Sequence, residues 1–134
     1  MNRSLIIATA VALASSAAWG AKDTTPEQLM AEYSAKAGAP GSPERGQKLY
    51  ARNFGRDLGL SCSSCHGDNP AKRGTHALTD KRIAPLAPAA NAARFTDRTA
   101  VELNFRMNCK DVIGRECTAG EKADLLSWLL TVKP

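Results

Sequence analysis

Apolar residues recur at helical spacing in four stretches of this 134-residue chain. The first two stretches begin alike: Thr25-Pro26 and Ser42-Pro43 each place a capping residue before a proline, which suits the first position of a helix. They predict one helix that runs to about Lys36 and a second that ends before the glycine-containing stretch 53–59, which is expected to be a loop.

The other two stretches lie in the C-terminal part of the chain. Phe95-Thr96-Asp97 predicts the start of a third helix, which ends near Asn108-Cys109. The last stretch begins at Thr118 with capping-box spacing to Glu121 and is the most apolar of the four. No stretch alternates convincingly between apolar and polar residues, and no repeat is present. The pattern therefore predicts an all-α domain of four or five helices.

Two features indicate how these elements pack. Gly46 shares a helix face with Leu49 and Tyr50, and a glycine on a packing face predicts the close approach of another helix. The apolar last helix is its expected partner.

The segment Ile83–Pro88 is apolar but carries two prolines, which exclude an interior helix or strand. It predicts extended chain lying against an apolar group, whereas the polar stretch 67–80 predicts a loop.

The first 20 residues predict a secretory signal peptide. Arg3 supplies the positive charge, Leu5–Leu13 the apolar region, and small residues lead up to Gly20, after which cleavage is expected. The apolar run is short for a membrane span, and an uncleaved membrane anchor is the alternative. The expected product is one exported domain, residues 21–134, with no membrane span after cleavage.

Composition and charge indicate which cofactors and binding partners the chain is suited to. Aromatic residues make up only 5% of the chain, so a large apolar cofactor would add substantially to a small core. The net charge of +5 comes without a block of basic residues, which argues against nucleic acid and fits docking to an acidic redox partner. Lys72, Arg73, Lys81 and Arg82 are candidates for such a docking face, with ordinary solvated surface as the alternative.

Candidate chemistry concentrates in the segment Cys62-Ser-Ser-Cys65-His66. Two thiols three residues apart, followed at once by a histidine, are typical of c-type haem attachment. Cys62 and Cys65 then form thioethers, and His66 binds iron as the proximal ligand. A thioredoxin-like site needs a βαβ context that the helical pattern lacks. A zinc site that recruits Cys109 and Cys117 would have unusual ligand spacing. The motif therefore predicts one covalently attached haem c.

The residues themselves leave the other ligands of the iron open. Met107 is the generic sixth ligand, because methionine opposite histidine is common in small electron-transfer cytochromes c. Met30 in the first helix suits a core position, and His76 in a polar loop suits solvation. On the proximal side, a backbone carbonyl within 83–88 is the expected acceptor for the second ring nitrogen of His66.

Cys109 and Cys117 complete an even count of four cysteines. In an oxidising compartment, the two that follow the third helix predict a disulfide. This ring is expected to stabilise the fold by about 2–3 kcal/mol through chain entropy. It also lies directly after Met107 and Asn108, so it is expected to hold the end of the third helix over the iron.

Several blocks of sequence resemble the sphaeroides haem protein family of high-spin c-type cytochromes. They are Cys62-Ser-Ser-Cys-His-Gly, Ile83-Ala-Pro-Leu-Ala-Pro, Arg94-Phe-Thr-Asp, Asn108-Cys-Lys-Asp-Val-Ile-Gly-Arg-Glu-Cys117 and Gly120-Glu-Lys-Ala-Asp-Leu-Leu-Ser-Trp128. The resemblance implies a class I cytochrome c fold with an additional N-terminal helix. It also implies that Asn108 binds ferric iron as sixth ligand and leaves on reduction. The related cytochrome c-double-prime group has histidine at that position, so Asn108 favours the oxygen-binding branch.

Together these observations predict a periplasmic cytochrome that transfers electrons and binds O2, NO or CO at ferrous haem. The resemblance implies a dihaem cytochrome c as electron donor. A conventional low-spin carrier with Met107 as permanent ligand is the first alternative, and a haem-based sensor or scavenger of nitric oxide is the second. No paired carboxylates and no nucleophile with an adjacent base stand out, so an enzyme is not expected.

Overall fold

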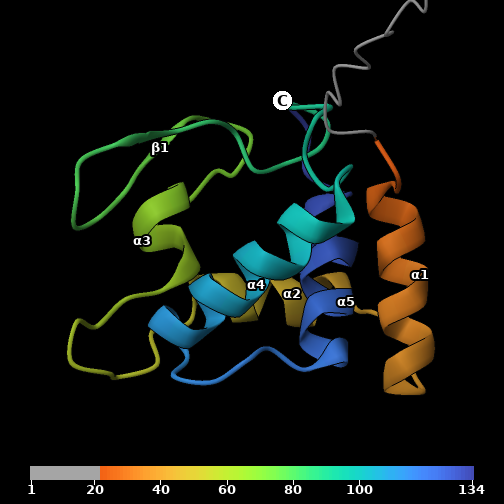
Figure 1. The fold of residues 1–134 in the computed structure, drawn as a ribbon. Helices are drawn as coiled ribbons and strands as arrows, with labels where there is room; N and C mark the ends of the chain where they lie inside the picture. Colours follow the sequence, from red (N-terminus) through yellow and green to blue (C-terminus); the bar gives the residue numbers. More distant parts are fainter. Residues whose placement is uncertain (1–21) are drawn as a thin grey trace, which may run out of the picture.

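A computed structural model describes residues 22–134 of the chain, and the expected signal peptide lies outside these residues (Figure 1). Five helices and one small hairpin follow in order: α1 (Pro26–Ala37), α2 (Pro43–Ala51), α3 (Cys62–His66), β1 (Gly74–Thr75), β2 (Arg82–Ile83), α4 (Arg98–Val112) and α5 (Ala119–Leu129). The predicted all-α fold is therefore confirmed, and each of the four predicted helices is present. Within residues 22–134 no helix is both long and apolar enough to cross a membrane.

Local capping explains where the helices begin. Thr25 forms a capping box with Gln28 at α1, and Thr118 forms another with Glu121 at α5. Asp97 caps α4 by accepting a hydrogen bond from the backbone N–H of Ala100. The C-terminal end of α4 differs from the expectation, because the helix continues past Cys109 to Val112.

The stretch 67–80, predicted as a loop, contains β1, which pairs in a short antiparallel hairpin with β2 just after this stretch. Gly74 pairs with Ile83 and Thr75 with Arg82, and the backbone N–H of His76 donates to the carbonyl of Lys81 at 2.8 Å. Two residues on each strand are too few to show alternation in the sequence, so the pattern could not reveal them.

The close approach predicted at Gly46 is present between α2 and α5. A Cβ atom on Gly46 would overlap the carbonyl oxygen of Asp124 and would lie 2.9 Å from Cβ of Trp128. One turn further along α2, the Tyr50 ring packs on the Trp128 ring with centroids 4.7 Å apart. The fully buried side chains Leu29, Leu126 and Leu129 extend this core between α1 and α5.

An ion pair between the exposed Arg45 and the buried Asp124 joins the start of α2 to α5. Asp124 is only 8% exposed, and its carboxylate accepts two hydrogen bonds from the Arg45 guanidinium at 2.7 and 2.8 Å. The same carboxylate accepts from the backbone N–H of Ser42 at 2.7 Å. A buried carboxylate with all these partners is well compensated, and it fixes the register between the two helices.

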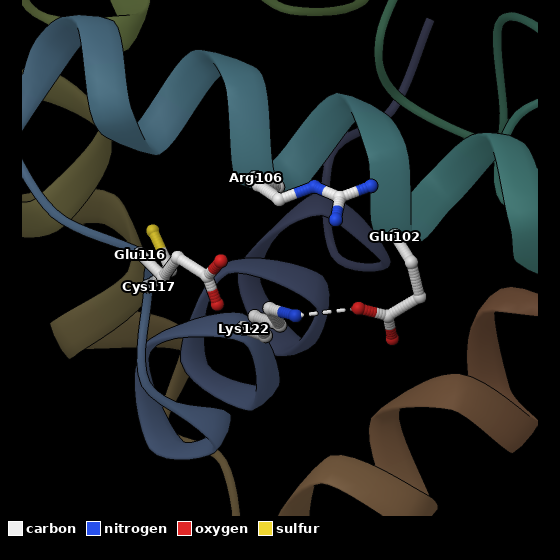
Figure 2. A pocket seen from close by; sticks show the side chains of 5 residues that line it. All are labelled: Glu102, Arg106, Glu116, Cys117 and Lys122. Atoms are coloured by element: carbon white, nitrogen blue, oxygen red, sulfur yellow. Dashed lines mark hydrogen bonds and ion pairs between the residues drawn. The ribbon is translucent and has the colours of Figure 1, made fainter.

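Helix α4 approaches the other helices less closely and is held largely through side chains. Figure 2 shows Lys122 of α5 reaching Glu102 of α4, with Nζ 2.7 Å from Oε2. The Tyr33 hydroxyl of α1 donates to the other oxygen of Glu102 at 2.6 Å, and burial raises the pKa of this tyrosine. The Lys122 ammonium also lies 5.4 Å from the centre of the Phe105 ring. These contacts hold the middle of α4 against α1 and α5, and the Cys109–Cys117 disulfide holds its C-terminal end.

Candidate functional site

A cavity of about 760 Å3 lies between α3 and α4. Its size falls within the range of pockets that enclose cofactors. Most of the lining side chains are apolar, among them Leu60, Ile83, Leu86, Val101 and Phe105. Ile83 and Leu86 belong to the apolar proline-containing segment, so this segment lies against the cavity. Cys62, Cys65 and His66 line it from α3.

The short helix α3 places its three reactive side chains through local hydrogen bonds. Ser61 forms a capping box with Ser64 at the start of the helix, and Gly67 ends it with φ of 75°. The Tyr50 hydroxyl of α2 donates to the carbonyl of Gly67 at 2.5 Å. His66 is therefore the last helical residue of a turn that is fixed at both ends.

Glycine at position 74 lets the hairpin pack directly on this turn. A Cβ atom on Gly74 would overlap the carbonyl oxygen of Cys65 and would lie 2.8 Å from Cα of His66. In the loop that joins β1 to β2, the backbone N–H of Ala77 donates to Sγ of Cys65 at 3.3 Å. Gly74 is a supporting residue that the sequence did not reveal, because nothing near position 74 signals a contact with the motif.

The electrostatics of the turn suit metal binding by a neutral imidazole. Burial, with smaller contributions from the nearby charge of Arg94 and from His76, lowers the pKa of His66 to about 4. The ring is therefore uncharged at neutral pH, with one nitrogen free to bind a metal. Burial raises the pKa of the Cys62 thiol to about 11.

The second ring nitrogen of His66 does not have the partner expected from the sequence. Nδ1 is buried and makes no hydrogen bond within residues 22–134. The carbonyls of Ala84 and Pro85, which belong to the expected acceptor segment, instead accept from the Arg94 guanidinium at 2.7 and 2.9 Å. The expected hydrogen bond to a backbone carbonyl of 83–88 is therefore not present in this structure, and two of the candidate carbonyls accept from a cation nine and ten residues further along the chain.

The four candidates for the sixth ligand occupy different places. Asn108 lines the cavity from α4, whereas Met107 is 53% exposed and is not part of the lining. Met30 packs against the core, where its sulfur accepts a hydrogen bond from the Ser127 hydroxyl at 3.1 Å. His76 lines the cavity, and its Nδ1 accepts from the backbone N–H of Leu78.

Helical spacing explains why two adjacent residues differ in this way. Asn108 follows Val101 by seven residues and Phe105 by three, which places all three on the face of α4 that lines the cavity. Met107 follows Leu103 by four, and both are exposed, at 53% and 45%. The sequence contained this signal, since the periodicity of α4 alone separates the two faces.

The predicted disulfide between Cys109 and Cys117 is present, with the two Cα atoms 5.6 Å apart. Cys109 is buried on α4, so the ring fixes the helix end directly after Asn108. Gly114 within the ring has φ of 90°, and a Cβ atom there would overlap Nη1 of Arg56. The guanidinium of Arg56, from the loop before α3, therefore packs on the ring across the cavity.

Comparison with known proteins decides the family. The model of a domain of unknown function, DUF1924, matches residues 36–129. The c-type cytochrome protein SHP of Cereibacter sphaeroides is 50% identical over 111 residues, which cover 81% of this chain and 85% of SHP. The chain belongs to the DUF1924 domain family and to the family of SHP and cytochrome c''. Cytochrome c'' of Methylophilus methylotrophus is 42% identical over 88 residues, which cover 64% of this chain and 61% of that protein.

Solved structures of the SHP and cytochrome c'' family share the fold. The structure of oxidised SHP, described as an oxygen-binding cytochrome c, matches 80% of this chain and 96% of its own with a TM-score of 0.75. Oxidised cytochrome c'' is 36% identical and matches 81% of this chain and 95% of its own with a TM-score of 0.76. The predicted resemblance and the cytochrome c fold are therefore confirmed.

A covalently attached haem c is the cofactor of this family of c-type cytochromes, and the residues of the cavity fit it. Cys62 and Cys65 are unpaired cysteines on the cavity wall and can form the two thioethers. His66 is uncharged, as an iron ligand must be, and the remaining wall is largely apolar, which suits a porphyrin.

Proposed function

We propose that the mature chain is a periplasmic cytochrome that transfers electrons and binds a diatomic ligand, O2 in the first place, at ferrous iron. Asn108 is the proposed sixth ligand of ferric iron, and it leaves on reduction. The observation that carries the proposal is that Asn108 lines the cavity, whereas Met107 does not. Two relatives support this proposal. SHP is described as an oxygen-binding cytochrome c, and the solution structure of cytochrome c'' is described as giving the structural basis of haem-ligand detachment.

The chemistry of an amide ligand agrees with such a switch. Bound haem c would supply an iron that changes oxidation state and can take a further ligand besides His66. The amide oxygen of Asn108 is a hard and weak donor, which suits ferric iron better than ferrous iron. The Cys109–Cys117 disulfide fixes the helix end directly after Asn108 and would keep the amide near the cavity after it leaves the iron. This role requires electron transfer and ligand binding, and no enzymatic turnover is part of the proposal.

Spectra of two neighbouring variants test the ligand. We expect the reduced wild-type protein to bind carbon monoxide, because the sixth position is then open. Asn108→Ala should alter the ferric spectrum and leave the ferrous spectrum nearly unchanged. Met107→Leu, the matched control on the exposed face, should change neither. A low-spin ferrous protein that ignores carbon monoxide, and that becomes reactive only in Met107→Leu, would instead establish the conventional His/Met carrier.

We also propose that an acidic redox protein, such as a dihaem cytochrome c, docks beside the hairpin. Lys72, Arg73, Lys81 and Arg82 are all exposed and lie at or near β1 and β2, which adjoin α3. Opposite charges accelerate encounter, and salt screens them.

Electron transfer from a dihaem cytochrome c is therefore expected to slow as the ionic strength rises from 0.01 to about 0.2 M. The double variant Arg73→Glu/Lys81→Glu should slow the reaction at low salt and reduce its dependence on salt. Stopped-flow reduction measures both effects. Rates independent of salt and of these charges would rule out the docking face.

A further inference from the structure

Helix α4 presents two amides to the cavity. Asn104 and Asn108 both line it and are four residues apart, so they are neighbours on one helix face, with Cβ atoms about 5–6 Å apart. No role was predicted for Asn104 from the sequence. It lies in the interior of the helix, where it has no capping function, and asparagine is a weak helix former there.

The other asparagines within residues 22–134 have an evident local purpose. Asn53 donates to the carbonyl of Gly59 at 2.7 Å, Asn69 accepts from the N–H of Ala71 at 2.9 Å, and Asn91 donates to the carbonyl of Pro85 at 3.2 Å. Each of them shapes a loop. Within the part of the chain that the structure describes, the side chains of Asn104 and Asn108 make no hydrogen bond to protein.

The cavity-lining face of α4 carries two uncharged polar side chains among apolar ones. Leu103, Asn104, Met107 and Asn108 are all exposed, but only the two asparagines line the cavity, together with the apolar Val101 and Phe105. Asn108 has a role there in the proposed function, as the iron ligand, whereas no contact within the described residues accounts for Asn104.

We propose that Asn104 donates a hydrogen bond to the diatomic ligand that occupies the position vacated by Asn108. This inference rests on the proposed function and extends it to ligand selectivity. An amide NH2 group is a hydrogen-bond donor, and a neighbour one helical turn away can reach a ligand at the position of Asn108. Such a donor would favour O2, which would accept a hydrogen bond at this position, over CO, which accepts only weakly.

One cation of the cavity wall lies beside the end of α4. Arg56 lines the cavity and packs on Gly114, within the Cys109–Cys117 ring that directly follows Asn108. Asp97 and Asp111 are the two acidic residues in the lining. A fixed donor next to the ligand acts more strongly in a largely apolar pocket than in water.

Asn104→Leu tests the inference, because leucine has nearly the same size, removes the donor and favours a helix. We expect the O2 dissociation rate of the ferrous protein to rise about tenfold, the effect of one hydrogen bond of ordinary strength. The CO dissociation rate should change by less than about twofold, since that ligand gains little from the donor. Asn104→Gln, which keeps the amide, should restore part of the difference. Met107→Leu is the control on the exposed face and should leave both rates unchanged.

A second readout does not depend on ligand rates. In the 15N-labelled reduced protein, the side-chain NH2 resonances of Asn104 should shift more on adding O2 than on adding CO, while those of Asn69 stay in place. Equal changes of the O2 and CO rates in Asn104→Leu, or no change, would overturn the role of Asn104. Failure of the reduced wild-type protein to bind either gas would instead overturn the proposed function, so the two failures can be distinguished.

Discussion

Replacing Gly46 with alanine is expected to lower the free energy of unfolding by about 3 kcal/mol, at the upper end of the usual cost of overpacking. The new Cβ atom would overlap the backbone of Asp124 on α5, and backbone cannot rotate away as a side chain can. In an unconstrained helix the same change would add about 0.5–1 kcal/mol of stability. The sign of the effect therefore reports the contact between α2 and α5. Chemical unfolding followed by circular dichroism measures it.

Gly120→Ala is the matched control for this substitution. Gly120 is also a helical glycine, in the first turn of α5, but the nearest atom to its Cβ position is Cβ of Ala37 at 3.7 Å, an ordinary contact. We expect its stability to be unchanged or to rise by up to about 1 kcal/mol. If Gly46→Ala proved as stable as Gly120→Ala, the close approach of the two helices would be refuted.

Removing the disulfide is expected to have the second largest effect. In the double variant Cys109→Ser/Cys117→Ser the free energy of unfolding should fall by about 2–3 kcal/mol, because the unfolded chain regains the entropy of the small loop. Asn108 directly precedes the ring, so the same variant should also weaken the proposed ferric ligand. Urea unfolding measures the first effect, and the ferric absorption spectrum measures the second.

The two effects of this variant have separate controls. Thiol titration of the native wild-type holoprotein should find none before reduction and two after it, since Cys62 and Cys65 are expected to be blocked by haem. Asn108→Ala should reproduce the ferric spectrum of the double variant without its loss of stability. A double variant with a wild-type ferric spectrum would show that the ring has only a stabilising role.

The sequence revealed features that depend on neighbours within one turn of a helix. Thr25, Thr118 and the Cys-x-x-Cys-His segment were recognised because each signal lies within a few adjacent residues. The contact at Gly46 followed from one glycine on an otherwise apolar face. The caps and the haem motif depend on short-range chemistry, so they can be worked out without knowing the fold. Gly46 differs, because its contact with α5 is long-range and was inferred only from the glycine and from the apolar last helix.

Contacts between distant segments could not be obtained in this way. Arg94 occupies the carbonyls of Ala84 and Pro85, and Gly74 packs on Cys65, because the fold brings these loops together. The residues around Arg94 and Gly74 in the sequence give no indication of the distant residues that these two contact. The choice between Met107 and Asn108 as the residue on the cavity side could be predicted in part. Once the extent of α4 is known, its helical period places Asn108, and not Met107, on the face that carries Val101 and Phe105.

The burial of Cys62 has a consequence for the order of events during maturation of the protein. In the folded chain, burial raises the pKa of this thiol to about 11, which leaves little of the thiolate that attacks a vinyl group. Attachment of haem is therefore expected to be fastest on the unfolded chain, before α3 packs against its neighbours. The cross-link between Cys109 and Cys117, which fixes the end of α4 beside the cavity, is then expected to form afterwards.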